Sequence, residues 1–121
     1  MPDRPMLYAL HREEVLRCMR AIAEPLRFRI LELLAESPGP RAGPFDVGEP
    51  GLCLSDLETR MGRPHALVSH HVRVLHDAGL VRRIRRGRWA LIQLDLGRLA
   101  DLGQNIAGFG LIMPNAPVQA A

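Results

Sequence analysis

The order of elements between residues 54 and 94 constrains the fold of this chain more than any other feature. Apolar residues recur there at helical spacing in two short runs, and a glycine suited to the left-handed end of a helix separates them. The first run ends at Gly62 and contains Leu54, Leu57 and Met61. The second extends from Pro64 to Ala78 and keeps one face apolar, with Val68, Val72, Leu75 and, beside them, Leu67 and Val74. Residues 80–94 read as two strands around a turn at Gly87.

Two short helices joined by a tight turn and followed by a hairpin form a winged helix-turn-helix. Amphipathic helical patterns flank this unit at residues 7–23, from Pro25 to a stop at Ser37-Pro38-Gly39, and at residues 96–113. The chain therefore predicts a mainly α fold with a small β-hairpin, organised as one domain over residues 1–121.

The last helical pattern carries more apolar surface than a small core needs. Its stripe contains Leu99, Leu102, Ile106, Phe109 or Gly110, and Met113. Small residues lie beside the stripe: Ala100, Gly103, Ala107 and Gly110. Two such helices from two copies could pack closely at the small residues, so the pattern predicts a homodimer.

Two segments lack helix and strand patterns. Residues 37–51 contain four prolines and four glycines, so we expect a flexible loop there. Residues 114–121, after the helix ends at Pro114, are expected to form a disordered tail.

Positive charge is concentrated in residues 60–88, although the whole chain carries only +3. This stretch holds eight arginines against one acid, a local charge of +7, so the remaining residues together carry −4. A solvated charged face is one interpretation of such a run. Because the charge coincides with a helix-turn-helix pattern, double-stranded DNA is the partner that we expect.

Burying the apolar face of the second helix turns the opposite face outward, with His65, Ala66, Ser69, His70 and Arg73. Such a helix can lie in the major groove, where arginine reads guanine, serine and histidine bond base edges, and alanine contacts a thymine methyl. The arginines near the hairpin turn are expected to hold the backbone or the minor groove, which positions the protein without selecting a sequence: Arg85, Arg86 and Arg88.

Other function classes find little support in the sequence. The chain has no apolar run long enough for a membrane span and no secretory signal at its start, so we expect a cytoplasmic protein without a membrane partner. It contains no nucleophile elbow, phosphate-binding loop or HExxH pair, so we do not expect an enzyme.

The sequence resembles the ArsR/SmtB family of metal-responsive repressors. The resemblance rests on MGRPHALVSHHVRVL at residues 61–75, the following Ala-Gly-Leu-Val and Gly-Arg-Trp motifs, and MRAIAEPLRFRIL at residues 19–31. It covers residues 15–110 apart from the proline- and glycine-rich loop. It implies a homodimer closed by its first and last helices, with the element order ααααββα. It also implies a repressor that leaves its operator when an inducer binds.

Two features depart from the family pattern. Pro64 stands where a serine-type residue usually caps the recognition helix, so one capping hydrogen bond is absent. The loop at 37–51 is also longer than is typical of the family. We expect both departures to affect operator preference and neither to prevent DNA binding.

The resemblance also implies places where an inducer could bind. One family site uses Asp and His from the last helix, but residues 95–121 contain no His, so a zinc site of that type is not expected. Another lies at the start of the first helix of the helix-turn-helix, where this chain has Cys53 and has Ser55 in place of a second cysteine. Cys18 is the only other thiol.

Cys18 and Cys53 could hold As(III), Sb(III) or another soft ion as an inducer, and no constitutive cofactor is expected. Two alternatives stay open: a reversible redox or sulfur switch, and two cysteines that simply pack in the core. The histidines of the second helix favour DNA contact or partial burial over metal binding, because His71 and His76 lack the i,i+4 spacing of a helical metal pair.

Overall fold

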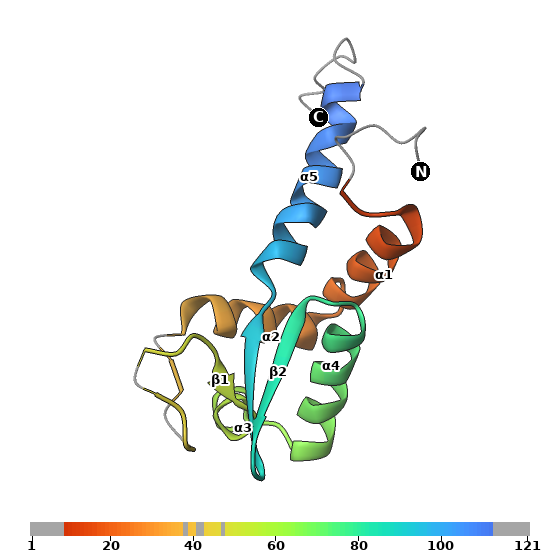
Figure 1. Cartoon of the computed structure of the whole chain (residues 1–121). Coiled ribbons are helices and arrows are strands. Elements are labelled where there is room, and N and C mark those ends of the chain that lie inside the picture. The colour runs from red at the N-terminus through yellow and green to blue at the C-terminus, as the bar shows by residue number, and fades with distance from the viewer. Residues whose placement is uncertain (1–8, 38, 41–42, 47, 113–121) are drawn as a thin grey trace.

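The computed structural model describes residues 9–37, 39–40, 43–46 and 48–112, and it forms five helices and a three-stranded sheet (Figure 1). The helices are α1 (Arg12–Ile22), α2 (Pro25–Glu36), α3 (Leu54–Met61), α4 (His65–Asp77) and α5 (Leu96–Ile112). The strands are β1 (Leu52–Cys53), β2 (Val81–Arg86) and β3 (Trp89–Leu94). Figure 1 shows α5 projecting away from the sheet beside α1, while the β2–β3 turn and the start of α4 lie at the opposite end.

The helix boundaries follow from local capping. The Glu24 carboxylate accepts the Arg27 N–H at 2.8 Å, and Pro25 fills the first turn of α2, where a missing N–H costs nothing. Asp56 accepts the Cys53 N–H at 3.1 Å at the start of α3. Gly62 ends α3 in the left-handed conformation with φ 62°, as its position in the sequence predicted.

The sheet is antiparallel in the order β1-β3-β2. The predicted hairpin is confirmed, with Val81 opposite Leu94 and Arg86 opposite Trp89. β1 was not predicted: Leu52 and Cys53 pair with Ile92 and Leu91 and add a third strand along β3. The observed order is therefore ααβααββα, one short strand more than the family resemblance implied.

The first helix is shorter than predicted. It begins at Arg12, because Ala9 and Leu10 are not helical and residues 7–8 lie outside the described residues. Leu10 instead packs on α5, where its N–H donates to the Asn105 Oδ1 at 2.9 Å and its carbonyl accepts from Asn105 Nδ2 at 3.1 Å. Met113 and the predicted tail at 114–121 also lie outside the described residues.

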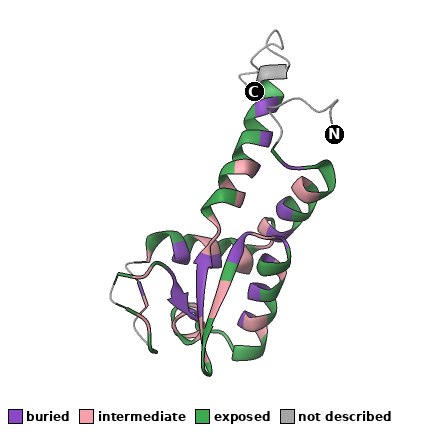
Figure 2. Cartoon of the chain, viewed as in Figure 1, coloured by how far each residue is buried: buried purple, intermediate pink, exposed green. Residues whose placement is uncertain are grey.

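The core lies between the helices and one face of the sheet, as the buried positions in Figure 2 show. From α4 it receives the three predicted residues, Val68, Val72 and Leu75, which are almost completely buried. The other elements contribute aliphatic side chains, among them Ile30, Leu33, Leu57, Leu80 and Ile92. Burial of these side chains fixes α4 against the rest of the domain, so its opposite face is held outward.

Gly51 permits the chain to enter β1. Its φ is 109°, and a Cβ there would lie 2.2 Å from the Ile92 carbonyl oxygen. Gly48 also has a positive φ, 92°, but a Cβ there would meet nothing within 4 Å. An alanine at position 51 would therefore meet both a steric clash and backbone strain, whereas an alanine at position 48 would meet backbone strain alone.

We expect Gly51→Ala to lower the free energy of unfolding by roughly 3 kcal/mol or more, and Gly48→Ala by about 1 kcal/mol. The extra loss comes from displacing β1 from β3, since a backbone carbonyl cannot move aside cheaply. Urea denaturation followed by circular dichroism would measure both values. Equal losses for the two variants would contradict a close approach between Gly51 and β3.

Candidate DNA-binding surface

The outward face of α4 carries all five side chains that the sequence assigned to base contact. His65, Ala66, His70 and Arg73 are exposed, and Ser69 is half-buried. The helix is anchored from behind by its buried valines and leucine. Pro64 precedes it without a side-chain capping hydrogen bond, as expected from the sequence.

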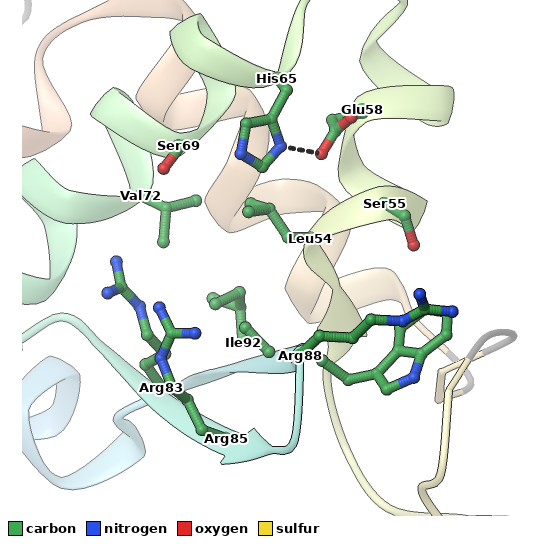
Figure 3. A pocket seen from close by; sticks show the side chains of 12 residues that line it. Leu54, Ser55, Glu58, His65, Ser69, Val72, Arg83, Arg85, Arg88 and Ile92 are labelled. Carbon is green, nitrogen blue, oxygen red and sulfur yellow. Dashed lines mark hydrogen bonds and ion pairs between the residues drawn. The ribbon is translucent and has the colours of Figure 1, made fainter.

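A groove separates α4 and α3 from the wing, which we define as β2, β3 and the turn at residues 87–88. Figure 3 shows its floor, formed by Leu54, Val72 and Ile92. Polar side chains line it from three elements: Ser55 and Glu58 from α3, His65 and Ser69 from α4, and Arg83, Arg85 and Arg88 from the wing. The groove thus brings two of the five predicted base-contacting residues, His65 and Ser69, together with two of the three predicted backbone-binding arginines, Arg85 and Arg88.

Glu58 is a groove residue that the sequence did not reveal. Its Oε2 lies 2.8 Å from His65 Nδ1, which joins the end of α3 to the start of α4 (Figure 3). With Nδ1 engaged in this way, Nε2 is the ring nitrogen left to meet a partner in the groove. The contact joins residues of two different helices across a turn. The periodicity of each helix, taken by itself, therefore could not have predicted it.

The three predicted wing arginines differ in their surroundings. Arg85 and Arg88 are exposed, and the Arg88 guanidinium lies 5.6 Å from the centre of the Trp89 ring. Arg86 instead contacts the 37–51 loop, where its Nη2 lies 3.0 Å from Glu49 Oε1. Arg85 and Arg88 are therefore better placed for DNA than Arg86 in this structure.

A polar network supports α4 from behind. The Glu-Pro-Leu-Arg motif places Arg27 so that its Nε donates to the Ala21 carbonyl at 2.7 Å and its Nη1 lies 3.1 Å from His71 Nδ1. The Glu24 Oε2 is 3.8 Å from the same ring nitrogen. Burial lowers the pKa of His71, and Arg27 lowers it further, whereas Glu24 acts in the opposite direction. His71 is therefore a buried neutral acceptor for Arg27 and not part of the DNA-facing surface.

The two cysteines occupy different parts of the domain. Cys18 on α1 is fully buried, and its Sγ donates to the Ala78 carbonyl at 3.4 Å. Burial raises the pKa of the Cys18 thiol, which disfavours the thiolate that binds soft metals. Cys53 is buried on β1 opposite Leu91, and Figure 1 shows β1 well apart from α1. Among the described residues, no three His, Cys, Asp or Glu side chains are grouped so that they could hold a metal ion.

The helix-turn-helix formed by α3 and α4, the arginine-bearing wing and the groove between them define a DNA-binding transcriptional regulator of the winged helix-turn-helix class. Residues 22–84 match the helix-turn-helix domain family, and the chain belongs to that family. In the part of the chain that the structure describes, none of the helices has the length and apolar character needed to cross a lipid bilayer.

Comparison with individual proteins agrees with this assignment. An uncharacterised helix-turn-helix-type transcriptional regulator from Methanocaldococcus jannaschii is 27% identical over 77 residues, which cover 64% of this chain and 73% of the relative. An ArsR-like transcriptional regulator from Rhodococcus sp. RHA1 has the same fold, with a TM-score of 0.66, 20% identity and coverage of 84% of each chain.

A third similar structure is the homodimeric winged helix-turn-helix DNA-binding domain of a possible ArsR-family regulator from Mycobacterium bovis. It matches with a TM-score of 0.59 and 21% identity over 98% of this chain and 100% of that domain. The winged helix-turn-helix fold that the resemblance to the ArsR family implied is confirmed by these matches. The matched proteins are transcriptional regulators, a non-enzymatic class.

Proposed function

We propose that the protein is a homodimeric repressor that reads an operator with α4 and holds the flanking backbone with its wing. The observation that carries this proposal is the groove between them, which His65 and Ser69 of α4 line together with Arg83, Arg85 and Arg88 of the wing. Insertion of α4 into the major groove would bring the wing arginines to the adjacent phosphates or minor groove.

Dimerisation is supported by apolar side chains left exposed on α1 and α5. Leu16 and Met19 on α1 are 40% and 45% exposed, and Ile106 and Phe109 on α5 are 41% and 57% exposed. The predicted small residues of α5, Ala100, Gly103, Ala107 and Gly110, are also exposed. We assign these two helices to the interface between two copies, in agreement with the homodimeric relative from M. bovis.

The family resemblance adds an inducer that would release the operator, and arsenite or another soft ion bound by Cys18 and Cys53 is one candidate. The geometry favours the alternative in which both cysteines pack in the core. Each thiol is almost completely buried, on a separate element, and Cys18 already donates to a backbone carbonyl. We therefore propose that release does not depend on a metal held by these two cysteines, whether from one protomer or from two.

Stoichiometric arsenite should then leave operator binding unchanged, and a Cys18→Ser/Cys53→Ser double variant should behave like the wild type. Loss of binding on adding arsenite, restored by excess dithiol and absent in the double variant, would instead establish the cysteines as the inducer site.

The DNA-reading assignment is tested by comparing Arg73→Ala with Arg88→Ala, which remove the same charge from two exposed positions. Selection of bound duplexes from a random pool should yield an operator for the wild type. Arg73→Ala is expected to relax the preference at one base pair of each half-site, by roughly 1–3 kcal/mol. Arg88→Ala should weaken binding to all sequences alike, because it removes a phosphate contact. Identical selected sequences for Arg73→Ala and the wild type would contradict base reading by α4.

A further inference from the structure

The described part of the 37–51 loop lies against the wing and surrounds one arginine. We call residues 43–46 and 48–50 the wing-binding segment. The Pro44 carbonyl accepts from Arg86 Nη1 at 3.1 Å, and the Glu49 Oε1 lies 3.0 Å from Arg86 Nη2. The Arg86 guanidinium carbon also lies 5.0 Å from the centre of the Phe45 ring. Three different interactions therefore converge on a single side chain.

Contacts on either side hold this segment near the wing. The Pro50 carbonyl accepts from Gln93 Nε2 on β3 at 2.9 Å. The Gly51 carbonyl accepts from Ser37 Oγ at 3.1 Å. Gly43 lies so close to the ring of Trp89 that a Cβ there would be 2.9 Å from the indole. The loop predicted to be flexible is thus in contact with β3 and with the end of β2.

Only one of the two carboxylate oxygens of Glu49 takes part in the ion pair with Arg86. The other carboxylate oxygen, Glu49 Oε2, is buried and has no hydrogen-bond partner among the described residues. Burying an unsatisfied carboxylate oxygen costs free energy and offsets much of what the ion pair contributes. The Arg86 side chain remains 42% exposed, so an incoming group can reach it.

A DNA phosphate would offer Arg86 a better partner than Glu49 does. A guanidinium can bind phosphate with two parallel hydrogen bonds, and exchange would return the buried Glu49 oxygen to water. While Glu49 stays in place, its negative charge also neutralises Arg86 at the surface that must approach DNA.

We propose that the wing-binding segment holds Arg86 away from DNA, and that Glu49 and a backbone phosphate compete for this arginine. The proposal rests on the DNA-binding function proposed above and adds an affinity-determining residue, Glu49, outside the helix-turn-helix. DNA affinity is lower than the arginines of the wing could provide, because one ion pair within the protein must break for Arg86 to bind.

The test uses the full-length protein and a fluorescent duplex of mixed sequence, because a phosphate contact does not depend on the operator. Glu49→Gln is expected to tighten binding about two- to fivefold at 50 mM salt, measured by fluorescence anisotropy. Glu36→Gln, which removes one negative charge from the exposed end of α2, is the matched control and should change affinity less. Unchanged or weaker binding by Glu49→Gln would overturn the proposal, the latter by showing that the segment positions the wing for DNA.

A double-mutant cycle separates competition for Arg86 from general repulsion of DNA. In an Arg86→Ala background, Glu49→Gln should no longer tighten binding, because the contested side chain is gone. An equal gain in both backgrounds would show that Glu49 repels DNA directly, and would overturn competition. If the wild type does not bind the duplex at low salt, the proposed function itself fails. If it binds and the cycle shows no coupling, only the competition fails.

Discussion

Affinity for a mixed-sequence duplex is expected to fall by roughly a thousandfold between 50 and 200 mM salt. Each arginine that neutralises a phosphate releases a condensed counterion, and a dimer that makes about six such contacts reaches this slope. The structure supplies exposed candidates in each protomer, namely Arg85 and Arg88 on the wing and Arg63 before α4. Anisotropy titrations at four or five salt concentrations would give the slope directly.

The arginines that cause this dependence can be identified in the same assay. Replacing Arg85 and Arg88 together by alanine should reduce the salt slope by about 0.9 for each phosphate that the variant no longer neutralises. Replacing Arg29 by alanine is the control, since this exposed α2 residue lies outside the basic stretch and pairs with Glu32. A wild-type affinity that hardly changes with salt would contradict a role of the wing in binding phosphates.

Ile106→Glu is expected to raise the dimer dissociation constant by at least about a hundredfold. A symmetric interface receives the substitution twice, and each copy would bury an unpaired carboxylate where two apolar helices meet. Because Ile106 is 41% exposed in the single chain, the protomer should stay folded. Sedimentation equilibrium would measure the dissociation constant, and circular dichroism would check the helix content.

Leu96→Glu provides the control for this prediction. Leu96 begins α5 beside the sheet and is 71% exposed, so the same new charge lies at the far end of the helix from Ile106. It should leave the dimer intact. If the Ile106→Glu protein dimerises as tightly as the wild type, the exposed stripe of α5 is not the dimer interface. Operator affinity should fall with dimer dissociation, because a monomer can occupy only one half-site.

Local patterns predicted the helices, the hairpin and the buried face of α4, because periodicity and capping act over a few residues. β1 could not be predicted in this way. It has only two residues, and it becomes a strand by pairing with Ile92 and Leu91, about forty positions along the chain. A signal of alternation needs at least four residues, so only the tertiary structure reveals it.

In the candidate DNA-binding surface, too, local patterns predict some features, and others depend on how separate elements pack. The exposed face of α4 follows from helical geometry once its apolar face is known. The pairs that modify this face, Glu58 with His65 and Glu49 with Arg86, join side chains across turns and loops. Their partners depend on how separate elements pack, which composition and spacing do not encode. The sequence therefore predicted which side chains of α4 face outward, but not the carboxylates that pair with His65 and Arg86.

The position of Trp89 allows the wing to be followed by intrinsic fluorescence. The chain contains one tryptophan, and its indole lies close to Gly43 of the wing-binding segment and 5.6 Å from the Arg88 guanidinium. All indole emission from the unlabelled protein therefore originates at β3, in the wing that we propose contacts DNA. A change in its intensity or wavelength would report movement of the wing or of the segment beside it, with no background from the dimer helices and no attached dye.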